Sequence, residues 1–480
     1  MQIHANTAMP ARSDTPLGDR GSALYVLGIS LVVACGGLLF GYDFVVIGGA
    51  KPFFERYFAL DDPMLSGWAN SCALIGCLAG VIVAGGLSDR FGRRRLLMAS
   101  ALLFAVTSVG NALAPTFVLF VTWRMMGGVA IGLASNLSPL YIAEVAPPHL
   151  RGRLVSINQL TIVLGILLAQ FVNWFLVRDM PAGVSNEWIA SSWFGRLGWR
   201  WMFGLTAVPS VFFFAGMFFV PESPRWLATK GRMDAARAIL SRISGTASAD
   251  VALGEIRSAI AGEPGKVSFR ALLDPRMRKV VVLGVTLAVF QQWCGINVIF
   301  NYAEDIFSAA GYDISSVLKN IAWTGSVNLV FTFVALGFVD KRGRRPLMLA
   351  GAAGLALIYA IMGGCFYAEI KGVVMLLLVL AAIACYSMSL APVTWVVISE
   401  IFPTRIRGAA VAVAVAALWA ACFVLTYTFP LLNEAFGAAG TFWLYSIICL
   451  SGLLFIVFQL PETKGRSLEE LERELIKHEK

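Results

Sequence analysis

Apolar segments of about 20 residues recur along this chain, and short polar loops separate them. A helix of about that length crosses the roughly 30 Å hydrocarbon core of a membrane. The pattern predicts twelve spans, at 24–50, 65–88, 96–114, 116–142, 153–177, 199–220, 279–307, 316–339, 347–368, 373–400, 406–429 and 440–460. We therefore expect an all-α polytopic membrane protein.

Three segments lie outside the spans. Residues 1–23 are polar and aperiodic, which predicts a disordered tail, and residues 461–480 form a second tail. Residues 221–278 are charged with apolar positions at helical spacing, which predicts a few short surface helices; an unstructured linker is the alternative. The chain is thereby divided into one six-helix half at 24–220 and another at 279–460.

An internal repeat supports this division. DRFGRR at Asp89 recurs as DKRGRR at Asp340, EVAPPHLRG at Glu144 as EIFPTRIRG at Glu400, and PESPRW at Pro221 as PETKGR at Pro461. All three pairs are separated by about 250 residues and keep the same order, as in a duplicated half-transporter. We expect two pseudo-symmetric halves.

Composition excludes several classes of protein. The chain is 58% hydrophobic with a mean hydropathy of +0.75, which a soluble protein of this length would not need. Its +9 net charge comes from basic loops after the second, fourth, eighth and tenth spans, so we expect these loops and both termini to be cytoplasmic and no nucleic-acid binding. The three His lie outside the spans and the eight Cys form no CxxC pair, so no metal or cofactor is expected. No targeting signal is visible, which suits a bacterial inner membrane.

Uncharged polar residues gather in the seventh span. The stretch QQWCGINVIFNYAEDIF begins at Gln291 and includes two adjacent amides and two Asn. Gly-Ile-Asn at 295–297 should weaken the helix locally. An unpaired amide in hydrocarbon costs several kcal/mol, so such a cluster should face a cavity. Amides both donate and accept hydrogen bonds, which favours a polyhydroxylated, uncharged ligand such as a sugar.

One acid and one base lie at matching depth in the first half. Asp43 is about 10 Å and Arg124 about 12 Å from the same side of the membrane, at 1.5 Å per residue. A carboxylate inside a span is usually functional, and a neighbouring cation gives it two states. We expect Asp43 to carry a proton and release Arg124; a structural ion pair is the alternative.

Charged residues also recur at the cytoplasmic helix ends. They can form ion pairs in each half, and such a network can favour one conformation by a few kcal/mol. The residues are Asp89, Arg93, Arg94, Glu144 and Arg151 in the first half, and Asp340, Arg344, Arg345, Glu400 and Arg407 in the second. Charges that only set the topology are the alternative.

These motifs, with GGLLFGYD at 36–43 and QQWCGIN at 291–297, resemble the sugar porter family of the major facilitator superfamily from about Gly28 to Glu470. Bacterial proton-coupled xylose and hexose symporters are especially similar. The resemblance implies that the ion pairs, completed by Glu222 and Glu462, hold the outward-facing state. It also implies an acid at Asp43 in proton symporters and sugar contacts at Gln159, Gln291, Gln292, Asn297, Asn328 and Trp395. We include Asn301 and Trp419 among the candidate substrate-binding residues as well.

Several positions depart from the family pattern. Asn301 replaces a gate Tyr, Leu418 replaces an amide, and Thr206 stands where some symporters have an acid. Glu304 and Asp305 replace a Pro-containing turn. We expect a monomeric symporter, and no enzyme, that carries a pentose or hexose with a proton into the cytoplasm by alternating access. A passive facilitator and a sugar sensor are the alternatives.

Overall fold

The computed structural model describes residues 23–147, 150–181, 184–262, 272, 274–402 and 406–464, and these residues form helices without a strand. The expectations for residues 1–22 and 465–480 and for the side chains of Asp340 and Arg407 lie outside the described part of the chain.

The first half is a bundle of six crossings. Five are single helices: α1 (Ala23–Phe58), α2 (Pro63–Phe91), α3 (Arg93–Leu113), α4 (Phe117–Val145) and α5 (Arg151–Val177). The sixth follows the short α6 (Asn186–Ser191) and is divided into η1 (Phe194–Gly198), α7 (Trp199–Gly204) and α8 (Ala207–Gly216). Helices α1 and α5 pack so closely that a Cβ at Gly41 would lie 1.9 Å from the carbonyl oxygen of Ile162. Small residues permit this approach between membrane helices.

The second half has six further crossings. The seventh is divided into α12 (Pro275–Trp293), α13 (Ile296–Asn301) and α14 (Ala303–Ala309), and the tenth into α17 (Val373–Met388) and α18 (Leu390–Ile401). Helices α15 (Ile314–Arg342) and α16 (Arg344–Tyr367) are single. The last helix, α19 (Arg407–Gln459), contains the non-helical residue Gly437, with φ 66° and ψ 174°, and supplies two crossings.

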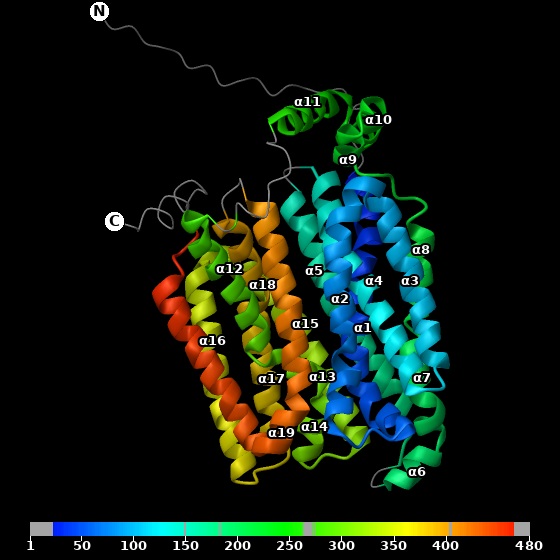
Figure 1. The fold of residues 1–480 in the computed structure, drawn as a ribbon, viewed down its shortest axis with the longest axis vertical. Helices are drawn as coiled ribbons and strands as arrows, with labels where there is room; N and C mark the ends of the chain where they lie inside the picture. Colours follow the sequence, from blue (N-terminus) through cyan, green and yellow to red (C-terminus); the bar gives the residue numbers. More distant parts are fainter. Residues whose placement is uncertain are drawn as a thin grey trace, which may run out of the picture.

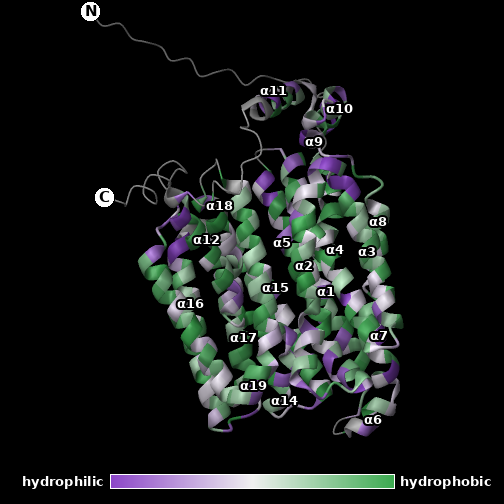
Figure 2. Cartoon of the chain, in the orientation of Figure 1, coloured by the Kyte–Doolittle hydropathy of each residue, from purple (hydrophilic) through white to green (hydrophobic). Residues whose placement is uncertain are grey.

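The helices account for the predicted twelve spans. Ten helical stretches of the described chain are long and apolar enough to cross a membrane, and the stretch Gly408–Gln459 has 52 residues, enough for two crossings. The sixth span is missing from those ten because it is divided. Figure 2 shows apolar residues along the middle of the bundle and hydrophilic residues gathered toward its two ends. The all-α, twelve-span prediction is confirmed.

The two ends of the bundle differ. The short helices expected between the halves are α9 (Pro224–Thr229), α10 (Met233–Ser244) and α11 (Thr246–Gly262), and they project from one end, here called the linker end (Figure 1). Helices α6 and α14 lie at the opposite end, here called the α6 end.

The polar contacts between the two halves lie toward the α6 end. Gln170 of α5 donates to the hydroxyl of Thr324 in α15 at 3.3 Å, and Lys51 of α1 contacts Asp305 of α14 at 2.7 Å. A Cβ at Gly48 of α1 would lie 2.5 Å from the carbonyl oxygen of Phe300 in α13, so the two backbones nearly touch. The halves are therefore packed together at the α6 end.

Candidate functional site

The seventh crossing is broken at a glycine inside the bundle. Gly295 separates α12 from α13 with φ 86°, a backbone conformation that only glycine adopts without strain. A Cβ there would lie 3.1 Å from the Tyr445 ring. The predicted local weakening at 295–297 is confirmed. The break turns the α13 side chains relative to those of α12 and brings Asn297 back toward Gln292.

Three of the predicted amides form one hydrogen-bonded chain, here called the amide chain: Gln291, Gln292 and Asn297. Nε2 of Gln291 donates to the backbone oxygen of Ala391 at 3.3 Å, and Nε2 of Gln292 donates to Oε1 of Gln291 at 3.3 Å. Nδ2 of Asn297 donates to Oε1 of Gln292. All three are buried, so their polarity is directed into protein and not toward lipid.

The other predicted ligand residues are not part of this hydrogen-bonded chain. Asn328 of α15 is buried and accepts a 2.6 Å hydrogen bond from Ser387 of α17. Trp419 packs on Phe40 of α1, with ring centroids 5.8 Å apart, so it joins the two halves. Gln159 is half-buried, and Trp395 is 41% exposed.

Asn301 ends α13 and is buried, and its Oδ1 has no hydrogen-bond partner within the described chain. Leu418, beside Trp419, is buried as well. The two departures from the family pattern therefore lie inside the protein.

Two buried polar residues were missed by the sequence reading. Ser387 holds Asn328, and Gln170 makes the contact with Thr324 between the halves. Gln170 lies eleven residues after Gln159, close to three helical turns, so both are on one face of α5. That spacing was a usable signal for Gln170. Ser387 gave no such signal, because a small hydroxyl is common in apolar spans.

The predicted acid–base pair is in direct contact. Nη1 of Arg124 lies 3.1 Å from both carboxylate oxygens of Asp43, and the residues are 2% and 5% exposed. The Arg124 guanidinium also lies 5.3 Å from the Phe203 ring centroid. Thr206 is buried, and its hydroxyl has no hydrogen-bond partner among the described residues. The carboxylate of Asp43 thus has one cationic partner in this conformation.

Helix α1 continues to Phe58, eight residues beyond the predicted end of the first span at residue 50. The contact between Asp43 and Arg124 places the two side chains at the same level of the bundle, as their matching depths predicted.

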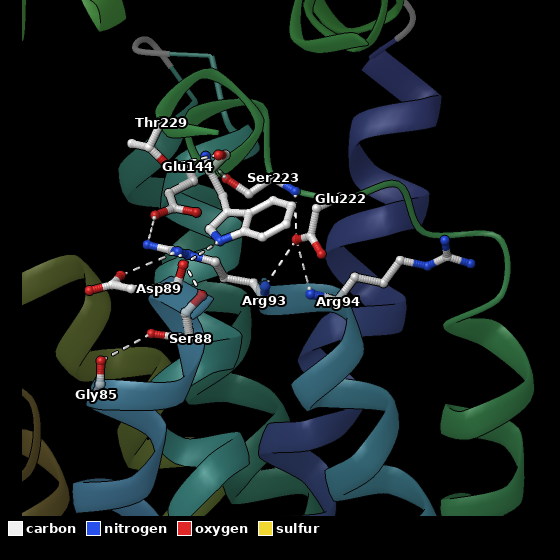
Figure 3. Close-up of polar contacts among 10 residues, drawn as sticks. Gly85, Ser88, Asp89, Arg93, Arg94, Glu144, Glu222, Ser223 and Thr229 are labelled. Carbon is white, nitrogen blue, oxygen red and sulfur yellow. Dashed lines mark hydrogen bonds and ion pairs between the residues drawn. The ribbon is translucent and has the colours of Figure 1, made fainter. Parts of the chain in front are cut away.

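The linker end of the first half holds an ion network (Figure 3). Arg93 contacts Glu144 at 3.1 Å and Asp89 at 3.6 Å. The Glu222 carboxylate accepts hydrogen bonds from the backbone N–H groups of Arg93 and Arg94 at 3.0 and 3.1 Å. It therefore caps the N-terminus of α3, where a negative charge is favourable.

The second half repeats this geometry. Arg344 contacts Glu400 at 3.1 Å, and Glu462 accepts from the backbone N–H groups of Arg344 and Arg345 at 3.0 and 3.1 Å. Burial would raise the pKa of Glu462, but its bonds from backbone N–H groups outweigh this and hold the pKa below the ordinary value. Each of these contacts lies within one half. Arg151 is exposed and has no ion pair within the described chain.

Comparisons with known proteins cover nearly the whole chain. Residues 29–475 match the family described as "Sugar (and other) transporter". The chain is 39% identical to the arabinose-proton symporter of Bacillus subtilis (strain 168), over 98% of this chain and 100% of that protein. It is 39% identical to the D-xylose-proton symporter of Escherichia coli (strain K12), over 93% and 95%. Its fold is similar to the partially occluded inward-open conformation of the xylose transporter XylE from E. coli, with TM-score 0.82, 37% identity, and coverage of 93% and 100%.

Proposed function

This chain belongs to the sugar transporter family, and from that premise we propose that it carries a monosaccharide, a pentose or a hexose, into the cytoplasm together with a proton. It is a multi-pass membrane transporter and not an enzyme. One observation carries the proposal: an ionisable pair is buried in one half, and an uncharged amide chain is buried in the other.

The amide chain is the proposed sugar site. Gln291, Gln292 and Asn297 bond to one another and to the backbone, and a sugar hydroxyl, which both donates and accepts, can replace those bonds without leaving an amide unpaired. The three amides include no charged side chain, so the amide chain offers no counter-charge to an ionic substrate. The proposed site also includes Gln159, Asn301, Asn328, Trp395 and Trp419.

Asp43 is the proposed proton carrier. Protonation removes its charge and leaves the Arg124 guanidinium without its carboxylate in a buried position, which is costly. The pair therefore has two states, one with the carboxylate bound to the guanidinium and one with the two groups apart. Because Asp43 belongs to α1 and Arg124 to α4, a change between these states can move the two helices relative to one another.

The proposed topology places the linker end in the cytoplasm, together with both termini. Basic residues gather at this end, including Arg90, Arg93, Arg151, Arg153 and Arg342, as the positive-inside rule requires. The α6 end then faces outward, and the packing of the halves at that end corresponds to an inward-open state. The exposure of Trp395 and the likeness to an inward-open relative support this assignment.

The proposed units are two six-helix halves, 24–220 and 279–460, joined by the helical segment 221–278, and a monomer suffices because both sites lie within one chain. In this inward-open state the ion networks hold helix ends within each half. We propose that the halves meet through these charged ends in the outward-facing state.

Reconstituted protein in liposomes would test the function with a panel of pentoses and hexoses. A pH electrode outside should record alkalinisation when one sugar is added, because each sugar taken up removes a proton. Counterflow of a sugar without proton movement would make the protein a passive facilitator. No binding or counterflow across the panel would refute monosaccharide transport.

A further inference from the structure

A buried lysine joins the two halves at the α6 end. Lys51 is 6% exposed, and its Nζ lies 2.7 Å from Asp305, 3.3 Å from Glu55 and 3.6 Å from Glu304. Lys51 and Glu55 belong to α1 in the first half, whereas Glu304 and Asp305 belong to α14 in the second. We call these four residues the outer charge cluster. Sequence reading left its two α14 acids unexplained.

The helices joined by the cluster are those that carry the two proposed sites. Lys51 lies eight residues after Asp43 on α1, about 12 Å along the helix axis. Glu304 and Asp305 follow α13, which holds Asn297 and continues from the amide chain. The cluster therefore connects the proton-carrying helix to the sugar-binding crossing.

The surroundings make the cluster depend on closure of the α6 end. The Lys51 ammonium also lies 5.8 Å from the ring centroid of Tyr302, whose hydroxyl donates to the backbone oxygen of Thr426 at 2.7 Å. Ser66 of α2 donates to Glu55 at 2.5 Å and holds the first-half side of the cluster. Separating the halves would break the two contacts to α14 but leave the one to Glu55 on the same helix.

Lys51 is the cation that acids of both halves share. Three carboxylates lie within 4 Å of its ammonium, and the charge of Arg56 also acts on Glu304, so removing Lys51 leaves Glu55 and Asp305 facing one another without their shared cation. Breaking a buried pair in this way is strongly destabilising, because an uncompensated charge remains. The penalty is confined to the conformation in which the halves meet at the α6 end, since the acids are solvated when they part.

We propose that Lys51 is a positioning residue of the transport cycle, which closes the outer gate by binding α14 and links the Asp43 helix to the sugar-binding crossing. The proposal rests on the transport function proposed above. Loss of Lys51 should shift the population toward the outward-open state, because a change that destabilises one state favours the other.

Hydrogen exchange at both ends of the full-length protein in detergent would test this. Lys51→Met should speed exchange in α14 and the start of α2, and slow it at the start of α5 and the end of α2, at the linker end. Lys51→Arg should behave as wild type because it keeps the charge. Lys319→Met is the matched control, since Lys319 is an exposed lysine at the same end without an ion pair in the described chain.

Sided transport gives a second readout. In counterflow, Lys51→Met should lower the half-saturation constant for sugar outside and raise it inside, changing their ratio about tenfold. The proposal would be overturned if hydrogen exchange became faster in α14 without slowing at the linker end. It would also be overturned if the two half-saturation constants changed equally, or if Lys51→Met behaved like Lys319→Met. If Lys51→Met does not fold, Asp305→Asn replaces it, because this change removes one partner of Lys51 at nearly constant volume. It should likewise speed hydrogen exchange at the α6 end and slow it at the linker end. A wild type without sugar transport would refute the proposed function, while the exchange experiment still decides the gate.

Discussion

Asp43, the proposed proton carrier, can be replaced by Asn with almost no change in side-chain volume, and this change should separate sugar movement from proton movement. The structure supplies one buried carboxylate paired with one arginine in the first half, which predicts one proton per sugar. A proton moving down a gradient of one pH unit releases about 1.4 kcal/mol, which sustains about a tenfold sugar gradient. Wild type should therefore accumulate sugar about tenfold, and Asp43→Asn should reach equal concentrations inside and outside.

The assay is uptake of labelled sugar into liposomes buffered one pH unit above the outside medium. Asp43→Asn leaves Arg124 buried without a counter-charge, and breaking such a pair costs about 3–5 kcal/mol. Equilibrium exchange without a gradient is therefore measured alongside, to show that the variant is folded and moves sugar. Asp62→Asn is the matched control, because Asp62 is an exposed N-cap that Asn replaces well. Accumulation retained in Asp43→Asn would show that the proton is carried elsewhere.

Three further predictions concern the amide chain, the helix break and the linker-end network. Gln292→Leu removes the partner of two buried amides and should weaken sugar binding about tenfold or more in calorimetry, whereas an unchanged affinity would remove the amide chain from the site. Gly295→Ala forces a side chain into a positive φ against Tyr445 and should cost about 1–2 kcal/mol, seen as a lower thermal midpoint; equal midpoints would contradict it. The pKa of Glu462 is lower in the folded state than its ordinary value of 4.5. Glu462 therefore stabilises the fold above pH 4.5, and this stabilisation is lost as the pH falls below 4.5 toward the folded-state pKa. The thermal midpoint should thus fall less on acidification in Glu462→Gln than in wild type.

Hydropathy was enough to place the crossings, because a span is defined by its own composition. It failed at the end of α1, where Lys51 and Pro52 look like the start of a polar loop. The helix continues, and Lys51 is paired there with Glu55 one turn further along α1 and with Glu304 and Asp305, about 250 residues away. No pattern within 24–50 contains that information. The sixth crossing is divided as well, and Gly204, Thr206 and Pro209 lie where α7 ends and α8 begins.

The sequence predicted those site residues that are charged or polar within an otherwise apolar span. Asp43 and Arg124 stand out as charges within spans, and their contact is confirmed. The hydrogen-bond partners were not predictable. Ser387 holds Asn328, and the backbone of Ala391 holds Gln291, because of how four helices (α12, α15, α17 and α18) lie in space. A single sequence fixes the depth of a residue but not the direction in which its neighbours approach.

The two ends of the bundle use charge differently, and the difference constrains the cycle. At the linker end, Arg93 and Arg344 bind acids of their own half, so opening that end leaves their charges paired. At the α6 end, Lys51 binds acids of the other half, so opening that end breaks its contacts to α14. The outward-facing state must therefore gain contacts elsewhere to offset this loss, and charged helix ends at the linker end are available to provide them. Because Lys51 and Asp43 share α1, a change in charge at Asp43 acts on the same helix that the outer charge cluster holds in place.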